Sequence, residues 1–238
     1  MSAEFGLTRE LLELYLRELA KEYRKRMGKK ASAEIVLVGG AAVLLNYGFR
    51  DMTNDIDAIV LAPSAIKDAI VAVAGKYNLP DDWINTDFTK TSSFSPKLLQ
   101  YSSFYQTYSN ILEIRTMRAE YLLAMKLVSG RTYKRDQSDI VGIIAAQQEA
   151  GAPILFEDVD RAVCELYGSW DDIDKDNKDL LKTALATSDI QALLQRVYDK
   201  ETSIHHDFLD AVAIGLKPKA FESAEALIAA AKRKKDRE

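Results

Sequence analysis

The sequence contains only one cysteine, Cys164, and two histidines in 238 residues. A single cysteine excludes an internal disulfide bond and a cysteine-based zinc cluster, and the adjacent His205 and His206 are too few to form a zinc site by themselves. We expect Cys164 to be a buried helix residue and both histidines to lie in a loop at the surface, without an assigned role. Neither structural zinc nor secretion is indicated.

An excess of positive charge is also lacking. The chain has 32 basic and 36 acidic residues, which gives a net charge of −4. The charge of the whole chain therefore does not indicate a nucleic-acid-binding protein. A local basic groove is still compatible with this balance, and basic residues do gather in one segment of the sequence, as Lys126, Arg131, Lys134 and Arg135.

Long hydrophobic runs are missing. No segment approaches the roughly 20 apolar residues of a membrane-spanning helix. Charged residues, namely Glu4, Arg9, Glu10 and Glu13, occupy the region where a signal peptide would be apolar. We therefore expect a cytoplasmic protein with no membrane partner. Hydrophobic residues still make up 47% of the chain, which is typical of a globular protein with a sizeable core.

The order of the predicted elements indicates an α/β (α+β) fold with a small mixed sheet. The predicted strands are residues 34–38, 55–61, one or two strands around 101–108, and 111–117. The predicted helices are residues 8–27, 41–47, 64–76, 119–129, 135–149, 157–167, 174–185, 189–198 and 223–232. After Pro153 the strand signals end, so we predict an N-terminal helix in residues 1–30, a mixed domain in residues 31–152 and a C-terminal helical domain in residues 153–238.

Asp55 and Asp57 open the second predicted strand. Residues two apart on a strand point to the same side, with Cα atoms about 6.5 Å apart, so these carboxylates can converge on shared metal ions. Two divalent ions held in this way support the transfer of a phosphoryl group. Asp-x-Asp is also a common surface-turn pattern, but here it leads into the apolar residues 59–61, where an uncompensated charge is costly.

Gly39 and Gly40 stand between a predicted strand and a predicted helix. Glycines permit a tight turn and let backbone N–H groups approach a phosphate at the positive end of the helix. Simple turn chemistry is an equally good explanation of this pair alone, so its meaning depends on the neighbouring aspartates.

The string VGGAAVLLNYGFRDMTNDIDAIV, residues 38–60, resembles the signature of the polymerase-β nucleotidyltransferase superfamily. Within that superfamily it is most similar to the AbiEii-like bacterial group. The matching residues are Gly39, Gly40, Ala42, Arg50, Thr53, Asp55, Ile56 and Asp57. This chain has one residue more between Arg50 and Thr53 than the pattern of that group.

The resemblance continues in RAEYLLAMKLVSGRTYKRDQSDI, residues 118–140, where a helical lysine precedes an Arg-Asp-x-x-Asp segment. Lys126, Arg135, Asp136 and Asp139 match. The resemblance implies that Lys126 holds phosphate, whereas a snorkelling lysine at a helix edge is the structural alternative. Asp136 is as well explained by a helix cap or a salt bridge as by a functional role, and Asp139 shares its helix face.

The superfamily usually adds a third carboxylate on a neighbouring strand, as the base that accepts a proton. Glu113, in the predicted strand 111–117, is the candidate. Because Glu113 and Arg115 lie on one face of that strand, a surface ion pair between them is an equally good explanation.

Taken together, the resemblance implies a nucleotidyltransferase fold that includes the helices of Lys126 and Asp136. Asp55 and Asp57 of this fold would bind Mg²⁺ or Mn²⁺. The protein would transfer NMP from an NTP to an acceptor hydroxyl. The residues expected to bind the nucleotide are Gly39, Gly40, Arg50, Thr53, Asn54 and Arg135. RNA or tRNA is the favoured acceptor, and the chain would be the toxin of a toxin–antitoxin pair with an antitoxin protein as partner. A small molecule, a protein hydroxyl, γ-phosphate transfer and a catalytically silent nucleotide- or partner-binding module are the alternatives.

Overall fold

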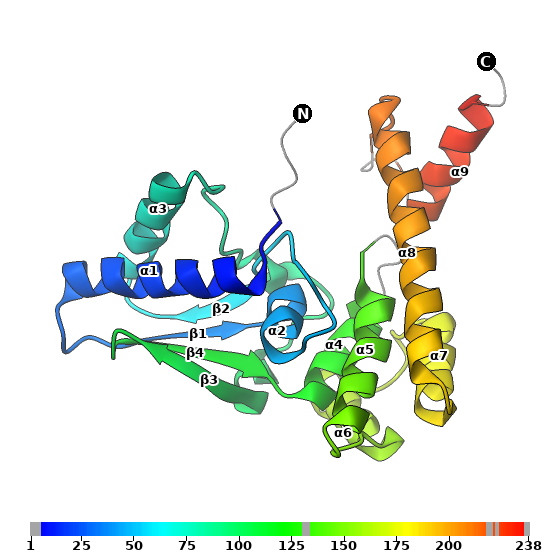
Figure 1. Cartoon of the computed structure of the whole chain (residues 1–238), viewed down its shortest axis with the longest axis horizontal. Coiled ribbons are helices and arrows are strands. Elements are labelled where there is room, and N and C mark those ends of the chain that lie inside the picture. The colour runs from blue at the N-terminus through cyan, green and yellow to red at the C-terminus, as the bar shows by residue number, and fades with distance from the viewer. Residues whose placement is uncertain (1–5, 130–133, 218–220, 222–223, 236–238) are drawn as a thin grey trace. The chain divides into compact units, whose positions relative to one another are not determined.

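A computed structural model describes residues 6–129, 134–217, 221 and 224–235 (Figure 1). The chain forms two compact units, the first from residues 1–125 and 157–170 and the second from residues 126–156 and 171–238. The α/β class expected from the sequence is confirmed. The division into domains after residues 30 and 152 stays a prediction.

The first unit is built on a four-stranded mixed sheet. Its strands, in order across the sheet, are β2 (Ala58–Leu61), β1 (Ala33–Leu37), β4 (Leu112–Met117) and β3 (Ser102–Tyr108). β1 runs antiparallel to β2 and parallel to β4, and β4 pairs antiparallel with β3. This arrangement leaves β2 at one edge of the sheet.

Helices cover one face of this sheet (Figure 1). They are α1 (Arg9–Met27) and α3 (Ala65–Tyr77), which contact each other. Leu12, Leu16 and Leu19 recur along α1 at helical spacing and are fully buried, in one hydrophobic cluster with Ile35 and Ile114 of the sheet. Thr8 caps α1, because its side chain accepts a hydrogen bond from the Leu11 amide.

In its described residues the first unit contains five further helical elements. They are α2 (Gly39–Asn46), the 3₁₀ helices η1 (Asp87–Lys90) and η2 (Pro96–Tyr101), the first seven residues of α4 (Ala119–Ser129), and α6 (Phe156–Tyr167) from its second residue on. α2 follows β1 after a single residue and is apolar except for its last residue, Asn46, so nearly all of it is buried.

The second unit is helical in its described residues. Besides the last residues of α4, it contains α5 (Asp136–Glu149), α7 (Lys175–Ala186), α8 (Ile190–Ala213) and α9 (Ala224–Lys235). α5 contacts both α7 and α8, and α8 contacts α9 through a small cluster of Ala211, Leu227 and Ala231. Ser223, the predicted start of the last helix, and Arg131 lie outside the described residues.

Two predicted boundaries near the aspartates are wrong. β2 begins at Ala58 and not at Asp55, because β1 ends at Leu37 and offers no partner strand for Asp55. α2 begins at Gly39, so the two glycines form its first turn instead of a separate loop before it. The aspartates therefore lie where the chain enters a strand, and the glycines lie where it enters a helix.

Two predictions in the helical segments are also wrong. Cys164 is exposed, because α6 buries Val159, Ala162 and Leu166 and turns the position of Cys164 away from them. His205 and His206 lie within α8 and not in a loop, because no glycine or proline interrupts the chain between residues 190 and 213. None of the described helices is both long and apolar enough to cross a bilayer.

Candidate functional site

Asp55 and Asp57 lie beside the end of β1. The Val38 amide donates to the Asp57 carbonyl over 2.9 Å, which extends the β1–β2 ladder by one pair beyond Leu37 and Ala58. Both aspartate side chains are half-buried. Since α2 starts directly after Val38, Asp57 lies at the N-terminus of that helix.

Both the backbone conformation at position 39 and the close approach of a neighbouring side chain require a glycine there. Its φ of +57° lies in the left-handed region, which residues with a side chain rarely adopt. A Cβ at this position would also lie 3.2 Å from the Asp57 Oδ2 atom. The first turn of α2 therefore approaches one carboxylate oxygen of Asp57 closely, and only glycine allows this approach without strain.

Gly40 is packed even more tightly. A Cβ there would lie 2.6 Å from the Thr53 hydroxyl and 2.9 Å from Nη2 of Arg50. Thr53 is buried, and its hydroxyl donates to the Asp55 carbonyl over 3.1 Å. Thr53 thus holds the backbone of Asp55 in position. Because the Thr53 side chain is buried, a substrate has little access to it.

Arg50 adds positive charge at the N-terminus of α2. Its Nε donates to the Met52 carbonyl, and its guanidinium lies against Gly40. The residue that precedes α2, Val38, cannot cap the helix with its side chain, so no side chain at the cap position occupies the N–H groups of the first turn. Helix N-terminus and guanidinium together make a site that favours an anion. Asn54 is exposed beside it.

Asn85 holds Asp57 from the opposite side. Its Nδ2 donates to Asp57 Oδ1 over 3.0 Å, and its backbone pairs with the chain at Ile56 and Ala58. Its own Oδ1 accepts from the Asp87 amide. Asn85 was not predicted from the sequence, because the residue is 28 positions from Asp57 and no local pattern links the two.

The donor set at this site fits a magnesium ion that binds together with a nucleotide. Among the described residues, no three His, Cys, Asp or Glu side chains gather in a group that could hold a metal ion by themselves. Magnesium commonly binds through one or two carboxylates and completes its shell with water and substrate phosphates. Asp55 and Asp57 next to an anion site correspond to that pattern, whereas a site made of protein ligands alone does not.

The structure does not bring Glu113 to these aspartates. In the sheet, Glu113 is in register with Glu34, whereas Asp57 pairs with Val38, four residues further along β1. At about 3.3 Å per residue this puts Glu113 about 13 Å away along the strand. Its carboxylate pairs with Arg115 over 2.9 Å, which is the ion pair considered above as the structural explanation. Arg115 also donates to the Ser102 hydroxyl and carbonyl.

A comparison with protein-family models gives one match, to the family described as nucleotidyltransferase of unknown function (DUF6036), over residues 15–148. The match covers more than half of the chain and includes both segments that carry the sequence resemblance. The chain belongs to this family. Comparisons with curated proteins and with solved structures return no match.

Membership in the nucleotidyltransferase family supports nucleotidyl transfer as the general chemistry. The family description names neither a substrate nor a metal nor an acceptor. Assignment to the AbiEii-like group therefore stays a prediction, and so do the roles of individual residues.

Lys126, Asp136 and Asp139 form a buried ion cluster in the second unit. The Lys126 amino group lies 2.7 Å from Asp136 Oδ1 and 2.7 Å from Asp139 Oδ2, and all three residues are buried. Asp136 also accepts from the Ser129 hydroxyl. Because Lys126 is only 5% exposed, its amino group does not snorkel to solvent at a helix edge. The cluster ties α4 to the first turn of α5.

Further polar groups surround this cluster. Glu201 of α8 accepts from the amides of Gln137 and Ser138 at the start of α5, over 2.8 and 3.2 Å. Burial raises the pKa of Glu201 to about 7, and the nearby Asp139 charge adds to the rise. Arg135 precedes α5 and lies 4.4 Å from the ring centre of Tyr198. Glu201 was not predicted from the sequence, because its partners are more than 60 residues away.

Proposed function

We propose that the chain transfers NMP from an NTP to an acceptor hydroxyl, with Mg²⁺ or Mn²⁺ held by Asp55 and Asp57. One observation carries this proposal: the Asp57 carboxylate approaches Gly39 in the first turn of α2, and Thr53, which binds Asp55, and Arg50 approach Gly40, so that a side chain at either glycine would block the approach. A metal-bound triphosphate needs carboxylates and anion-binding N–H groups in one place, and this site supplies both.

In this proposal each residue has a defined task. The N–H groups of the first turn of α2 and the Arg50 guanidinium bind phosphate oxygens. Thr53 and Asn85 position Asp55 and Asp57, and Asn54 contributes to the nucleotide site from its rim. The hydroxyl oxygen forms a bond to the α-phosphorus as the bond to pyrophosphate breaks. A bound magnesium ion would stabilise the negative charge on the phosphate oxygens.

The proton acceptor is proposed from the resemblance alone. The register of β4 gives no support to Glu113 in this role. Asp136 and Asp139 are the remaining carboxylates of the family motif, and Lys126 and Arg135 are its basic residues. Asp136 and Asp139 each form an ion pair with Lys126. A purely structural role for these two aspartates can therefore be tested as well as a catalytic one.

For the acceptor we propose RNA, with tRNA as the first candidate and an antitoxin as partner protein. This follows the AbiEii-like resemblance. Lys134 and Arg135 are the described basic residues of the segment that precedes α5, and both are half-buried. The acceptor is therefore the part of the proposal that most needs a direct experiment.

The test is incubation of the purified chain with each α-labelled NTP, Mg²⁺ or Mn²⁺, and total RNA, with a bacterial lysate as a second source of acceptors. We expect label in the RNA fraction. The double variant Asp55→Ala/Asp57→Ala should lose at least about 100-fold of this activity, since removing a group that stabilises transition-state charge typically costs this much or more. Asp51→Ala, an exposed aspartate of the same loop, is the matched control and should keep it.

Transfer that persists in the double variant would disprove the site. Transfer from γ-labelled but not α-labelled NTP would indicate a phosphotransferase. The position of Glu113 favours a second candidate, a nucleotide-binding module without catalysis, because the strand carboxylate usual in the superfamily does not join the pair. Binding of NTP with no transfer to any acceptor would support that candidate.

A further inference from the structure

The second half of α1 and the turn that follows it are strongly basic. Residues 21–30 include six basic residues and one acidic residue, so this segment has a charge of +5 in a chain whose net charge is −4. The first half of α1, residues 9–17, has two charged residues of each sign. We refer to the basic residues of the segment 17–30, together with Lys76 of α3, as the basic end.

The acidic residues of the basic end are buried beneath its cations. Glu18 pairs with Lys21 over 2.6 Å and with Lys76, and its side chain is 9% exposed, against 55% and 53% for the two lysines. Glu22 is likewise shared by two cations, and its side chain is 17% exposed, against 70% for Lys25. Each glutamate therefore leaves one cation in excess, and the charge that reaches solvent is mainly positive.

Lys29 and Lys30 add two cations that are not neutralised. Gly28 ends α1 with a φ of +78°, and the two lysines follow it in exposed positions. Neither has a hydrogen-bond or ion-pair partner among the residues that the structure describes. Cations also stabilise the negative end of a helix dipole, but this effect falls off within the last turn. It therefore does not explain the cations before and after that turn.

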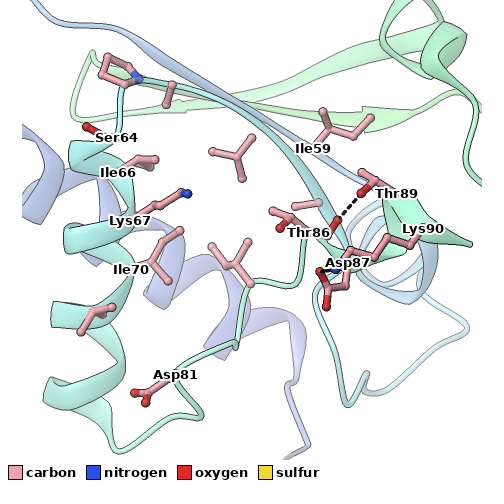
Figure 2. Close-up of a pocket in the computed structure, with 16 residues that line it drawn as sticks. Ile59, Ser64, Ile66, Lys67, Ile70, Asp81, Thr86, Asp87, Thr89 and Lys90 are labelled. Carbon is pink, nitrogen blue, oxygen red and sulfur yellow. Dashed lines mark hydrogen bonds and ion pairs between the residues drawn. The ribbon is translucent and has the colours of Figure 1, made fainter.

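The cavity between β2 and α3 has no such bias of charge (Figure 2). Lys67, Lys90, Asp81 and Asp87 line it, and Lys90 is paired with Asp87 over 2.7 Å. Positive and negative side chains are equal in number along this cavity, so their charges favour neither sign of ligand. The excess of exposed cations at the basic end does favour one sign, and it suits a ligand with many negative charges.

A nucleic acid suits the basic end better than a membrane does. A helix that lies on a membrane buries its apolar face in the lipid interface, whereas α1 buries Leu16, Leu19 and Tyr23 in the core of its own unit. Lysine and arginine can bind nucleic-acid phosphates without any apolar contact. Because Tyr23 is the aromatic residue of this segment and is buried, the segment recognises the backbone and does not stack on bases.

The basic end lies far from the aspartates of the proposed metal site. α1 begins near them, because Leu7 pairs with Thr53 through two backbone hydrogen bonds and the Thr53 hydroxyl bonds to Asp55. The helix then runs for 19 residues, about 27 Å, to the side of the first unit away from α2 (Figure 1). A nucleic acid that contacts both places must extend over about eight base steps of 3.4 Å.

We propose that the basic end binds the phosphate backbone of the RNA acceptor, about 27 Å from the hydroxyl that reacts. The acceptor is then an RNA with a stem of at least about eight base pairs, and not a small molecule or a protein hydroxyl. The role of this contact in transfer rests on the proposed function, whereas the binding of RNA does not.

Binding is tested with the whole chain and a fluorescein-labelled RNA hairpin of about 16 base pairs, without NTP. Fluorescence anisotropy should show binding that weakens steeply as NaCl is raised. Lys29→Glu/Lys30→Glu should weaken binding at least about tenfold at about 0.1 M NaCl. It should also reduce the slope of log K against log [NaCl] by about 2, since each phosphate contact contributes about 0.9.

Two further variants complete the binding test. Lys175→Glu/Lys182→Glu makes the same change of charge at two exposed lysines of α7 and should bind RNA as the unchanged protein does. Arg17→Gln/Lys21→Gln removes two cations of α1 while Lys76 still neutralises Glu18, and it should weaken RNA binding even if the first variant does not fold. Circular dichroism checks that each variant is folded.

Transfer of α-label separates this inference from the proposed function. With the RNA hairpin as acceptor, Lys29→Glu/Lys30→Glu should raise the KM for RNA at least about tenfold and change kcat little, because the contact lies far from the reacting atoms. With a trinucleotide acceptor, too short to reach the basic end, KM should be equal in variant and unchanged protein. If RNA binding depends on the basic end but no label is transferred, the proposed function fails and the RNA site stands.

Equal RNA binding by the unchanged protein and by both variants of the basic end would overturn the proposal, whether or not label is transferred. An unchanged KM for RNA in Lys29→Glu/Lys30→Glu would overturn the role of the contact in transfer. Vesicles with about 30% phosphatidylglycerol are the alternative probe. If they bind and the hairpin does not, the basic end is a membrane site. Transfer to a DNA duplex in place of the hairpin would identify DNA as the acceptor.

Discussion

At the scale of single residues, Gly40 shows how closely α2 approaches the loop that carries Arg50 and Thr53. Gly40→Ala should lower the free energy of unfolding by about 1–3 kcal/mol, because the added methyl group overlaps the Thr53 hydroxyl and the Arg50 guanidinium. Nucleotidyl transfer should fall as well. Urea denaturation measures the first effect and transfer of α-label the second.

Gly75→Ala is the control for that substitution. Gly75 lies inside α3, and a methyl group added there would have nothing within 4 Å, so alanine should raise the stability by about 0.5–1 kcal/mol through helix propensity. If Gly40→Ala also stabilised the chain, the close approach described above would be incorrect.

Glu201 gives the protein a pH-dependent stability. Burial raises its pKa from an ordinary value near 4.5 to about 7, so between these pH values the folded state binds more protons than the unfolded state. Stability contributed by the protonated group is present below pH 4.5 and is lost as the pH rises toward 7. The total is on the order of 3 kcal/mol.

Glu201→Gln removes this titration. The stability of the variant relative to the unchanged protein should therefore rise between about pH 4.5 and pH 7, as urea unfolding at a series of pH values would show. Glu149→Gln, an exposed glutamate of the same unit, should leave the pH dependence unchanged. A difference between variant and unchanged protein that is constant with pH would contradict the raised pKa.

At the scale of elements, the ion cluster of Lys126 fastens α4 to α5. Lys126→Met should destabilise the second unit by about 3–5 kcal/mol, because Asp136 and Asp139 would be buried without their cation. The exposed Lys182→Met should change stability by no more than about 0.5 kcal/mol. Thermal and urea unfolding followed by circular dichroism measure both.

The triple variant Lys126→Met/Asp136→Asn/Asp139→Asn separates structure from function. It removes all three charges at once, so most of the stability should return. If the cluster is only structural, nucleotidyl transfer returns too. If Lys126 acts on phosphate, as the resemblance implies, transfer stays lost in a stable protein.

At the same scale, the predicted elements are largely correct, since each depends on local periodicity. Leu12, Leu16 and Leu19 predicted α1, and the short apolar run before Gly39 predicted β1. The ends near the site were wrong because they depend on pairing: whether Asp55 is in a strand is decided by where β1 stops. α8 was predicted too short because the charged Glu201 stands at the position that follows Leu193 and Val197 on the buried face, which interrupts the apolar pattern there.

At the scale of the whole molecule, binding of Mg²⁺ and NTP should stabilise the chain. A ligand present at 100 times its dissociation constant adds about 2.7 kcal/mol to the stability of the form that binds it. Differential scanning fluorimetry should therefore show a higher Tm for the unchanged protein and for Asp51→Ala when both are added together. The Asp55→Ala/Asp57→Ala variant should show no shift, and an equal shift in that variant would place the ligand elsewhere.

The sequence by itself determined the family motif, because Gly39, Gly40, Asp55 and Asp57 lie close together along the chain and their chemistry can be read from spacing. Only the tertiary structure decided which other residues join them. The pairing of β1 with β4 moved Glu113 away from the aspartates, and the fold brought Asn85 to Asp57 and Glu201 to α5. Strand register and helix packing join residues far apart in sequence, and no local pattern carries that information.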